Sequence, residues 1–401
     1  MASDHESKQV AKPSIDTLIS THDFEAVASR TLQPKTWAFI SSAATDLVTK
    51  QRNVTAYADI TLRPRTLRDV SHVDLSTSML GHGLRVPLFC SPAAMAVLVH
   101  PAGEKAIGTA CKASGIAQCV STSASYPLRH ITAAVRDHPV DTPHDMPVFF
   151  QLYVDKNREN TRRLIQDAVE AGAKALFLTV DCPVPGKREA DERVQADVAV
   201  TSPLSGATAG HDSKGSALGR TMGRFIDPAL SWSDIPWIRS CAPGLPLVLK
   251  GIQTSEDAVL AMQARVDGIV VSNHGGRSLD TTPAAILILL ELRRNCPDLF
   301  DRMDVYVDGG ISRGTDIFKA LCLGAKAVGI GRGTLFAVNY GYEGVVRYIE
   351  ILRDELETTM KLCGVTSLQE LHPGYLNTLA VDHLIPPKPK APASASINSR
   401  L

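Results

Sequence analysis

The chain has 401 residues, and its 42 lysines and arginines are balanced by 42 aspartates and glutamates. A formal net charge of zero argues against a nucleic-acid-binding protein, which would carry a basic excess. Hydrophobic residues make up 44% of the chain and charged residues 21%, a composition typical of a folded globular protein. The longest apolar run, residues 284–290, is too short to span a membrane.

The two ends of the chain differ in composition from the middle. Residues 1–20 are polar, which predicts a disordered N-terminus without the apolar segment of a secretory signal. Residues 21–57 carry helical patterns, with Thr21 or Asp23 as N-cap and a break at Pro34. Residues 381–401 contain a stretch rich in Pro, Ala, Ser and Lys and predict a flexible tail. They end in Ser-Arg-Leu, a variant of the S-K-L address, so the expected location is peroxisomal or else cytoplasmic.

The eight cysteines are scattered, and none forms a C-x-x-C pair. Zinc and dithiol redox sites usually use that spacing, so we expect no metal site. Most of the cysteines stand in apolar stretches, which indicates buried thiols in a reducing compartment.

Short apolar runs alternate with longer amphipathic stretches through a single predicted domain, residues 21–380, whose core spans about 85–365. The eight runs are residues 87–90, 116–120, 148–152, 176–180, 247–249, 268–271, 305–307 and 327–330. This rhythm predicts the α/β class, a (β/α)8 TIM barrel with an N-terminal helical extension. The alternative is an open doubly wound sheet. Five late runs end in polar residues, which favours the barrel, because a barrel gathers its site at many strand ends. Residues 185–230 predict a long loop inserted after the fourth strand, over the barrel mouth.

Two consecutive runs are followed by glycine-rich loops. Asp308, Gly309 and Gly310 follow one run, and Gly331 and Arg332 follow the next. Glycines let backbone N–H groups approach an anion, and Arg332 adds a bidentate donor. Loops after the seventh and eighth strands of a barrel often bind phosphate, so the pattern predicts a phosphate site rather than tight turns alone.

The segment after the sixth run contains His274 and, three residues later, Arg277. A neutral His accepts protons near pH 7, and the Arg fork suits a carboxylate. Asp181 ends another run and could orient the His, or could simply cap a helix. Lys250 ends the run between them, where it could form a Schiff base or serve as a fixed charge.

The third run carries Gln151 and Tyr153. Side chains two residues apart on a strand lie on the same face, so these two side chains should point to the same side. They could belong to a site or to a polar layer within the barrel packing.

The ordered motifs of residues 22–372 resemble the FMN-dependent 2-hydroxy acid oxidases and dehydrogenases, such as glycolate oxidase, lactate oxidase and the flavin domain of flavocytochrome b2. The matching blocks are LRPR (62–65), SPAAM (91–95), HPxGE (100–104), FQLY (150–153), TVD (179–181), KREAD (187–191), KG (250–251), SNHGxRxLD (272–280) and DGG (308–310).

The resemblance implies a TIM barrel that holds FMN at its mouth, with a flavin-dependent oxidation of a small carboxylic acid. It implies that His274 is the base and Asp181 its partner, with Lys250 at the flavin N1 and C2 carbonyl. Arg277, Arg188 and Tyr153 would bind the substrate. The implied cofactor-binding residues are Pro92, Ala93, Ala94, Ser121, Gln151, Thr179, Lys250, Ser272, Asp308, Gly309, Gly310, Gly331 and Arg332.

Three positions depart from the family pattern. Phe39 stands where the family has a substrate-binding Tyr, so it keeps the ring and loses the hydroxyl. Ser312 stands where the family usually has an Arg near the FMN phosphate. Ser123 replaces a bulky aromatic of the substrate loop of glycolate oxidases, which suggests a roomier pocket.

We therefore expect an FMN-dependent oxidase or dehydrogenase of a 2-hydroxy acid or related carboxylic acid. The expected acceptor is O2, with H2O2 as product. One alternative is oxidation of a cyclic amino acid-like intermediate at a C–N or C–C bond, as in fungal tailoring enzymes similar to the oxidase of fusaric acid biosynthesis. A second is a flavin-binding protein with little turnover. An FMN-barrel isomerase is a less favoured reading. The first 80 residues are too few for a haem domain, and family members usually form homotetramers.

Overall fold

The chain folds around a closed barrel of eight parallel strands, seen in a computed structural model that describes residues 11–140, 146–195, 200–209 and 217–388. The barrel strands follow the order β4 (Leu88–Cys90), β5 (Ala117–Val120), β6 (Val148–Leu152), β7 (Leu176–Thr179), β10 (Leu247–Ile252), β11 (Gly268–Val271), β12 (Asp304–Asp308) and β13 (Ala327–Ile330). Each predicted run coincides with one of these strands. The barrel closes because β13 pairs in parallel with β4, which rules out the open sheet.

The floor of the barrel is apolar and aromatic. Each strand contributes one inward residue to this layer: Phe89, Cys119, Phe149, Phe177, Val248, Val270, Tyr306 and Ala327. The rings of Phe149 and Phe177 stack with centroids 5.2 Å apart, and Phe89 meets Tyr306 edge-on at 5.9 Å. The hairpin of β2 (Thr77–Met79) and β3 (His82–Leu84) adds Met79 and Leu84 to the same cluster. The amino-terminal end of the barrel is therefore filled.

Two residues further along each strand, the inward layer becomes polar or small. Its members are Ser91, Ser121, Gln151, Thr179, Lys250, Ser272, Asp308 and Gly329. Side chains two residues apart on a strand point to the same side of the sheet. The aromatic floor and this polar ring are therefore successive inward-facing layers of the same strands. The ring lies at the carboxyl end, where the predicted site residues belong.

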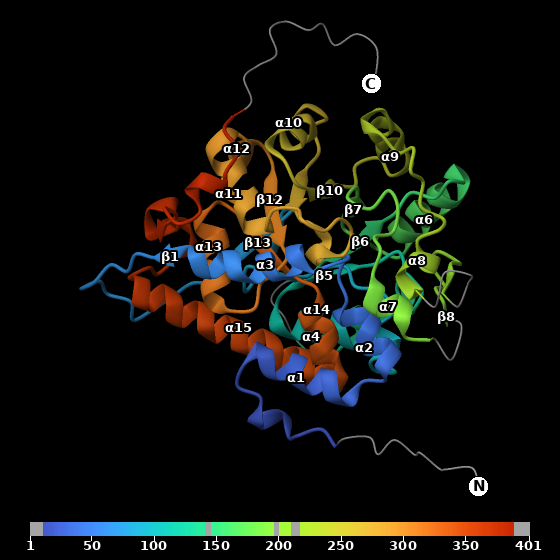
Figure 1. Cartoon of the computed structure of the whole chain (residues 1–401), viewed down its shortest axis with the longest axis horizontal. Coiled ribbons are helices and arrows are strands. Elements are labelled where there is room, and N and C mark those ends of the chain that lie inside the picture. Colours follow the sequence, from blue (N-terminus) through green and yellow to red (C-terminus); the bar gives the residue numbers. More distant parts are fainter. Residues whose placement is uncertain (1–10, 141–145, 196–199, 210–216, 389–401) are drawn as a thin grey trace, which may run out of the picture.

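Helices surround the barrel (Figure 1). They are α4 (Gly103–Ser114), α5 (Leu128–Asp137), α6 (Arg158–Glu170), α9 (Ile235–Cys241), α10 (Ser255–Gln263), α11 (Ala285–Asn295), α12 (Leu299–Arg302), α13 (Gly314–Cys322), α14 (Arg332–Ala337) and α15 (Gly341–Cys363). The long α15 packs on α4 and α13. No helix in the described part of the chain is both long and apolar enough to cross a membrane.

Short elements complete the described chain. They are the 3-10 turns η1 (Ile15–Thr17), η2 (Ala96–Leu98), η3 (Trp232–Asp234), η4 (His274–Gly276), η5 (Val338–Tyr340), η6 (Leu368–Glu370), η7 (Pro373–Tyr375) and η8 (Asp382–Leu384), and the strand pair β1 (Thr61–Leu62) and β14 (Leu376–Asn377).

The N-terminal extension forms three helices, α1 (Thr21–Thr31), α2 (Pro34–Ser41) and α3 (Val48–Asp59). Ser20 caps α1 in a capping box with Asp23, and Pro34 begins α2.

Residues at both ends of the described chain pack more than the sequence predicted. Residues 1–20 were expected to be disordered, but Leu18 is only 3% exposed in the main core and Lys12 donates to the carbonyl of Asn339. In the predicted tail, Val381 is likewise buried and η8 follows it. Apolar residues embedded in polar composition explain the difference. Residues 1–10 and the Ser-Arg-Leu ending lie outside the described residues.

The insertion between β7 and β10 covers the barrel mouth, as predicted. It contains α7 (Glu189–Arg193), the short hairpin β8 (Val200–Thr201) and β9 (Thr208–Ala209), and α8 (Leu218–Met222). Asp191 is fully buried and anchors this insertion, because it accepts a hydrogen bond from Lys35 of α2 at 2.6 Å and another from the Gly219 backbone at 3.2 Å.

Candidate active site

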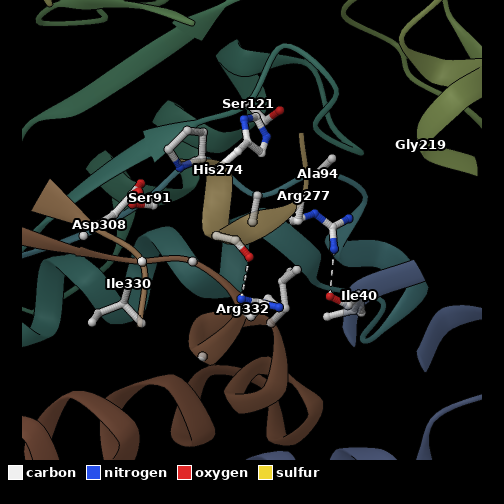
Figure 2. A pocket seen from close by; sticks show the side chains of 18 of the residues that line it. Ile40, Ser91, Ala94, Ser121, Gly219, His274, Arg277, Asp308, Ile330 and Arg332 are labelled. Atoms are coloured by element: carbon white, nitrogen blue, oxygen red, sulfur yellow. Dashed lines mark hydrogen bonds between the residues drawn. The ribbon is translucent and has the colours of Figure 1, made fainter. Parts of the chain in front are cut away.

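The carboxyl-terminal rim of the barrel encloses a large cavity that collects nearly all predicted site residues (Figure 2). The predicted residues that line it are Phe39, Pro92, Ala93, Ala94, Ser121, Gln151, Tyr153, Thr179, Arg188, Lys250, His274, Arg277, Asp308, Gly309, Gly310, Gly331 and Arg332. The cavity lining does not include Asp181 and Ser272. They stand behind two residues that do line it, His274 and Lys250, and hold them in place.

His274 and Asp181 form a hydrogen-bonded pair. Nδ1 of His274 lies 2.9 Å from Oδ1 of Asp181, whose side chain is completely buried. Burial pushes the pKa of Asp181 up, but the interaction with His274 and the charge of Lys250 outweigh burial and leave this pKa lowered. Asp181 therefore stays ionised and fixes one ring nitrogen. The other nitrogen, Nε2, faces the hydroxyl of Tyr153 at 3.4 Å.

The loop that carries His274 has an unusual backbone. His274 has φ of +59°, and Gly275 and Gly276 follow it at +63° and +75°. A left-handed conformation costs a non-glycine residue roughly 1–2 kcal/mol. Asn53 and Asn273 offset this cost by exchanging two amide hydrogen bonds of 2.8 Å, which tie the loop to α3. The histidine is thus held in a strained, fixed position, as is common at functional sites.

Lys250 is a buried cation at the bottom of the cavity. Its ammonium donates to Ser272 Oγ at 2.9 Å and lies 3.3 Å from Asp308. Burial lowers the pKa of Lys250, but the carboxylates of Asp308 and Asp181 more than compensate, so this pKa is raised. A protonated Lys250 cannot attack a carbonyl, which favours the fixed-charge alternative over a Schiff base.

Asp308 was predicted to hold phosphate, but its carboxylate points elsewhere. It accepts from Ser91 Oγ at 2.9 Å and pairs with Lys250 inside the barrel. Figure 2 shows Ser91 and Asp308 side by side. A carboxylate would repel an anion, so Gly310, Gly331 and Arg332 remain as the anion-facing groups of this loop pair.

Gln151 organises the opposite wall. Its side-chain oxygen accepts from Thr122 N at 3.1 Å and Ser121 Oγ at 3.3 Å, and its amide donates to Thr179 Oγ1 at 3.0 Å. These bonds fix the amide orientation. The three predicted residues of this wall therefore form one hydrogen-bonded polar edge, and Gln151 belongs to the polar layer of the barrel and also lines the cavity.

Arg277 grips the end of α2. Its guanidinium donates to the carbonyls of Phe39, Ile40 and Ser42 at 2.7–3.0 Å and lies 5.5 Å from the Phe39 ring centroid. Figure 2 shows the bond to Ile40. Burial, with the nearby charges of Arg188 and Arg332, lowers the pKa of Arg277 well below its usual value. An anion would relieve this cluster of positive charge.

Arg188 belongs to the insertion over the barrel mouth. Its Nε donates to the carbonyl of Arg277 at 3.2 Å, so the two arginines are linked. A Cβ on Gly219 of α8 would lie 2.2 Å from Nη1 of Arg188, so α8 packs directly on the guanidinium.

The anion-facing end of the cavity has an unsatisfied cation. Arg332 donates through Nη2 to the carbonyl of Gly275 at 2.9 Å, while its buried Nη1 has no acceptor among the described residues. A Cβ on Gly331 would have no neighbour within 4 Å, so bare backbone borders the cavity there. Gly310, with φ of +81°, could not be another residue, because a Cβ would lie 2.0 Å from Asn53 O.

Several cavity residues were not predicted. Glu25 and Lys50 reach it from the N-terminal helices, and Met222, Phe225 and Ile226 reach it from the insertion. Lys50 and Val54 are four residues apart on α3, a spacing that places both on one helix face. That spacing alone would not identify a cavity wall, because the α3 pattern predicts only an amphipathic helix.

Known proteins share this architecture. L-lactate dehydrogenase (cytochrome) of Saccharomyces cerevisiae is 42% identical over 376 residues, which span 91% of this chain but only 61% of that protein. Peroxisomal (S)-2-hydroxy-acid oxidase of Oryza sativa subsp. japonica is 40% identical, over 90% of this chain and 96% of the oxidase.

Solved structures agree. A flavocytochrome b2 variant with sulfite bound has a TM-score of 0.82 and 39% identity, and covers 94% of this chain and 91% of its own. Mandelate oxidase with (S)-4-hydroxymandelic acid has a TM-score of 0.81 and 32% identity, and covers 90% of this chain and 98% of its own. The model of the family described as FMN-dependent dehydrogenase matches residues 28–378. With most of its length matched by that model and the family's barrel around its cavity, the chain belongs to the FMN-dependent dehydrogenases.

Proposed function

We propose that this chain oxidises a 2-hydroxy acid to the 2-oxo acid, with His274 as the base. The observation that carries the proposal is the His274–Asp181 pair. Nε2 of His274 faces the Tyr153 hydroxyl at 3.4 Å, in a cavity that Arg277 also lines. The reaction removes two electrons and two protons from the acid. FMN, when bound, accepts the electrons and passes them on.

The residues present fit FMN. The unpartnered Nη1 of Arg332 and the bare backbone at Gly331 suit its phosphate, and the polar edge of Gln151 suits the hydrogen-bonding rim of its ring. Lys250 is a fixed positive charge beneath the cavity, which would stabilise negative charge on a reduced ring. The wall that follows β4, residues 92–94, offers small apolar side chains to its face.

Side chains of this protein supply the proton transfer and the substrate binding. Asp181 keeps Nδ1 of His274 bonded, so that Nε2 is the nitrogen available to take the substrate proton. Arg277, with Arg188 behind it, supplies the charge that binds the carboxylate. Tyr153 stays protonated, since burial raises its pKa well above the usual value, and it can donate to a substrate oxygen.

The electron acceptor is proposed to be O2, which would give H2O2. The name of the rice relative, a peroxisomal oxidase, supports this choice. The name of the yeast relative contains the word cytochrome and supports a cytochrome as the alternative acceptor. We further propose a peroxisomal location, in line with the names of the plant relatives, and a homotetramer.

A second candidate is a bulkier or cyclic acid, including a cyclic amino acid-like intermediate oxidised at a C–N or C–C bond. Two observations favour it. Phe39 brings no hydroxyl to the cavity, and Ser123 is a small residue of the same cavity wall, which also includes apolar side chains of the insertion. The acid in the mandelate oxidase structure, (S)-4-hydroxymandelic acid, is itself a bulky hydroxy acid.

The visible spectrum of the purified protein tests these proposals. A flavin spectrum that bleaches on anaerobic addition of a short 2-hydroxy acid supports the first, and one that bleaches only with a cyclic amino acid supports the second. A flavin spectrum that neither compound bleaches would indicate a flavin-binding protein with little turnover. Readmitting O2 and assaying H2O2, with cytochrome c as the competing acceptor, then decides the acceptor.

A further inference from the structure

Lys50 is a cation of the cavity wall to which the proposed chemistry gives no role. It comes from α3 and lines the same cavity as Gly310, Ser312 and Arg332. Its ammonium donates to the carbonyl of Ser41 at 2.9 Å, and this is the one acceptor that the described chain offers it. An ammonium has three N–H donors, so two remain for a ligand.

Gly275 and Gly276 contact both Arg332 and the start of α3, which carries Lys50. A Cβ on Gly276 would lie 2.7 Å from the backbone nitrogen of Lys50, so the start of α3 packs directly on this glycine. Arg332 Nη2 donates to the carbonyl of the preceding residue, Gly275. The backbone of Lys50 and the guanidinium of Arg332 therefore lie against the same short segment, and both side chains line the same cavity.

The electrostatics of the two side chains agree with this proximity. Burial lowers the pKa of Lys50 most, and the charge of Arg332 lowers it further, against an opposing effect of Glu25. Burial also lowers the pKa of Arg332, while Glu25 opposes that change. The cavity end thus holds two cations close together, with Glu25 as the nearby acid.

Other cations of this region are occupied. Arg313 follows Ser312 but pairs with Glu355 at 2.8 Å, and it is absent from the cavity wall. Ser312 donates to Asp316 both from its backbone N–H, at 3.0 Å, and from its hydroxyl, at 3.4 Å. Lys250 is paired with Asp308 deeper in the barrel. A dianionic group beside Arg332 would find its second positive charge on Lys50.

We propose that Lys50 is the second cationic ligand of the FMN phosphate, acting together with Arg332. The unpartnered Nη1 of Arg332 provides one donor and the free N–H groups of Lys50 provide the other. Hydrogen bonds to charged groups are each worth about 1.5–3 kcal/mol, so loss of Lys50 corresponds to about ten- to a hundredfold in affinity.

Comparison of FMN with riboflavin isolates the phosphate. The full-length chain, stripped of flavin, is titrated with each flavin, and binding is read from the quenching of flavin fluorescence. We expect Lys50→Met to raise the Kd for FMN about ten- to a hundredfold and to leave the Kd for riboflavin unchanged. A loss shared equally by both flavins would assign Lys50 to the packing of the loop at Gly276 and overturn the proposal, as would unchanged FMN binding.

Three further variants serve as controls for this experiment. Lys50→Gln removes the charge but keeps a donor for the Ser41 carbonyl, so it should lose FMN selectively even if Lys50→Met folds poorly. Lys50→Arg keeps the charge and should bind FMN nearly as the wild type does. Lys361→Met removes one positive charge from α15, where Lys361 pairs with Glu357, and should change neither Kd. A selective loss of FMN in this last variant would mean that overall charge, and not Lys50, matters.

Discussion

Nδ1 of His274 and Oδ1 of Asp181 lie 2.9 Å apart, although 93 residues separate them in the chain. Asp181 follows β7 and His274 follows β11, and these strands both flank β10 in the barrel. The pair therefore depends on the parallel pairing of β7, β10 and β11 and on the strained backbone of His274. It links the fold to the proposed base.

Replacing Asp181 by Asn should lower kcat by about 10²–10⁴-fold, the range associated with general acid–base catalysis. The amide cannot neutralise the imidazolium that forms when His274 takes a proton. Steady-state kinetics and flavin content are measured together, and flavin content should stay unchanged. A variant that keeps wild-type kcat would show that the charge of Asp181 does not assist His274.

Phe39→Tyr should lower KM for a short 2-hydroxy acid by about ten- to a hundredfold, because it would place a hydroxyl near Arg277, the proposed ligand of the substrate carboxylate. The kcat should change little, since the bond forms in the bound ground state as well. Phe39→Leu is the matched control, which removes the ring without adding a hydroxyl and should not lower KM. An unchanged KM in the Tyr variant would show that the ring does not face the substrate carboxylate.

Ser123→Leu tests the size of the substrate side chain. Ser123 is buried at the cavity wall, where its backbone N–H donates to Ser121 Oγ. A leucine would fill space there and should reduce kcat/KM for a bulky acid by about 10–200-fold relative to a short one. Ser123→Ala keeps the space and should preserve the ratio. Equal losses for both acids would place the substrate side chain elsewhere in the cavity.

Asp280 joins the active-site loop to α3. Its carboxylate accepts from Thr49 N at 2.8 Å, Asp46 N at 3.0 Å and Thr45 Oγ1 at 3.0 Å. Burial raises the pKa of Asp280, but these hydrogen bonds outweigh burial and lower it to about 2. Asp280→Asn places an NH2 group against these donors and should lower the free energy of unfolding by about 1–3 kcal/mol near neutral pH.

The pH dependence of that loss has a definite sign. A carboxyl whose pKa is lower in the folded state stabilises the protein above its unfolded pKa, about 3.9. Its contribution disappears as the pH falls from about 4 to the folded value of about 2. Urea unfolding of wild type and variant should therefore differ by a constant amount above about pH 5 and converge below pH 4. A difference independent of pH would assign the loss to packing.

The strands and the polar ring could be predicted from sequence, because inward-facing and outward-facing residues alternate along each strand. Phe149 and Gln151, or Val248 and Lys250, stand two residues apart on one inward face. The glycine loops and His274 follow the same strands, so their convergence was also predictable. Loops after adjacent parallel strands share an edge.

Residues that approach from other elements could not be predicted in this way. Lys50, Glu25 and Phe225 reach the cavity because helices and the insertion fold over the rim. The orientation of Asp308 depended on a partner, Lys250, from a different strand. Burial of Leu18 depends on core residues that come from distant parts of the chain. These are tertiary relationships, and local patterns do not contain them.

The aromatic floor has a kinetic consequence. The rings of Phe89, Phe149, Phe177 and Tyr306, with the hairpin beneath them, fill the amino-terminal end of the barrel. In the proposed reaction the acid, its oxidised product and a small acceptor such as O2 would therefore all enter and leave at the same rim, beside the insertion. Because they would share one entrance, bound acid should hinder access of the acceptor, and an excess of acid should inhibit turnover.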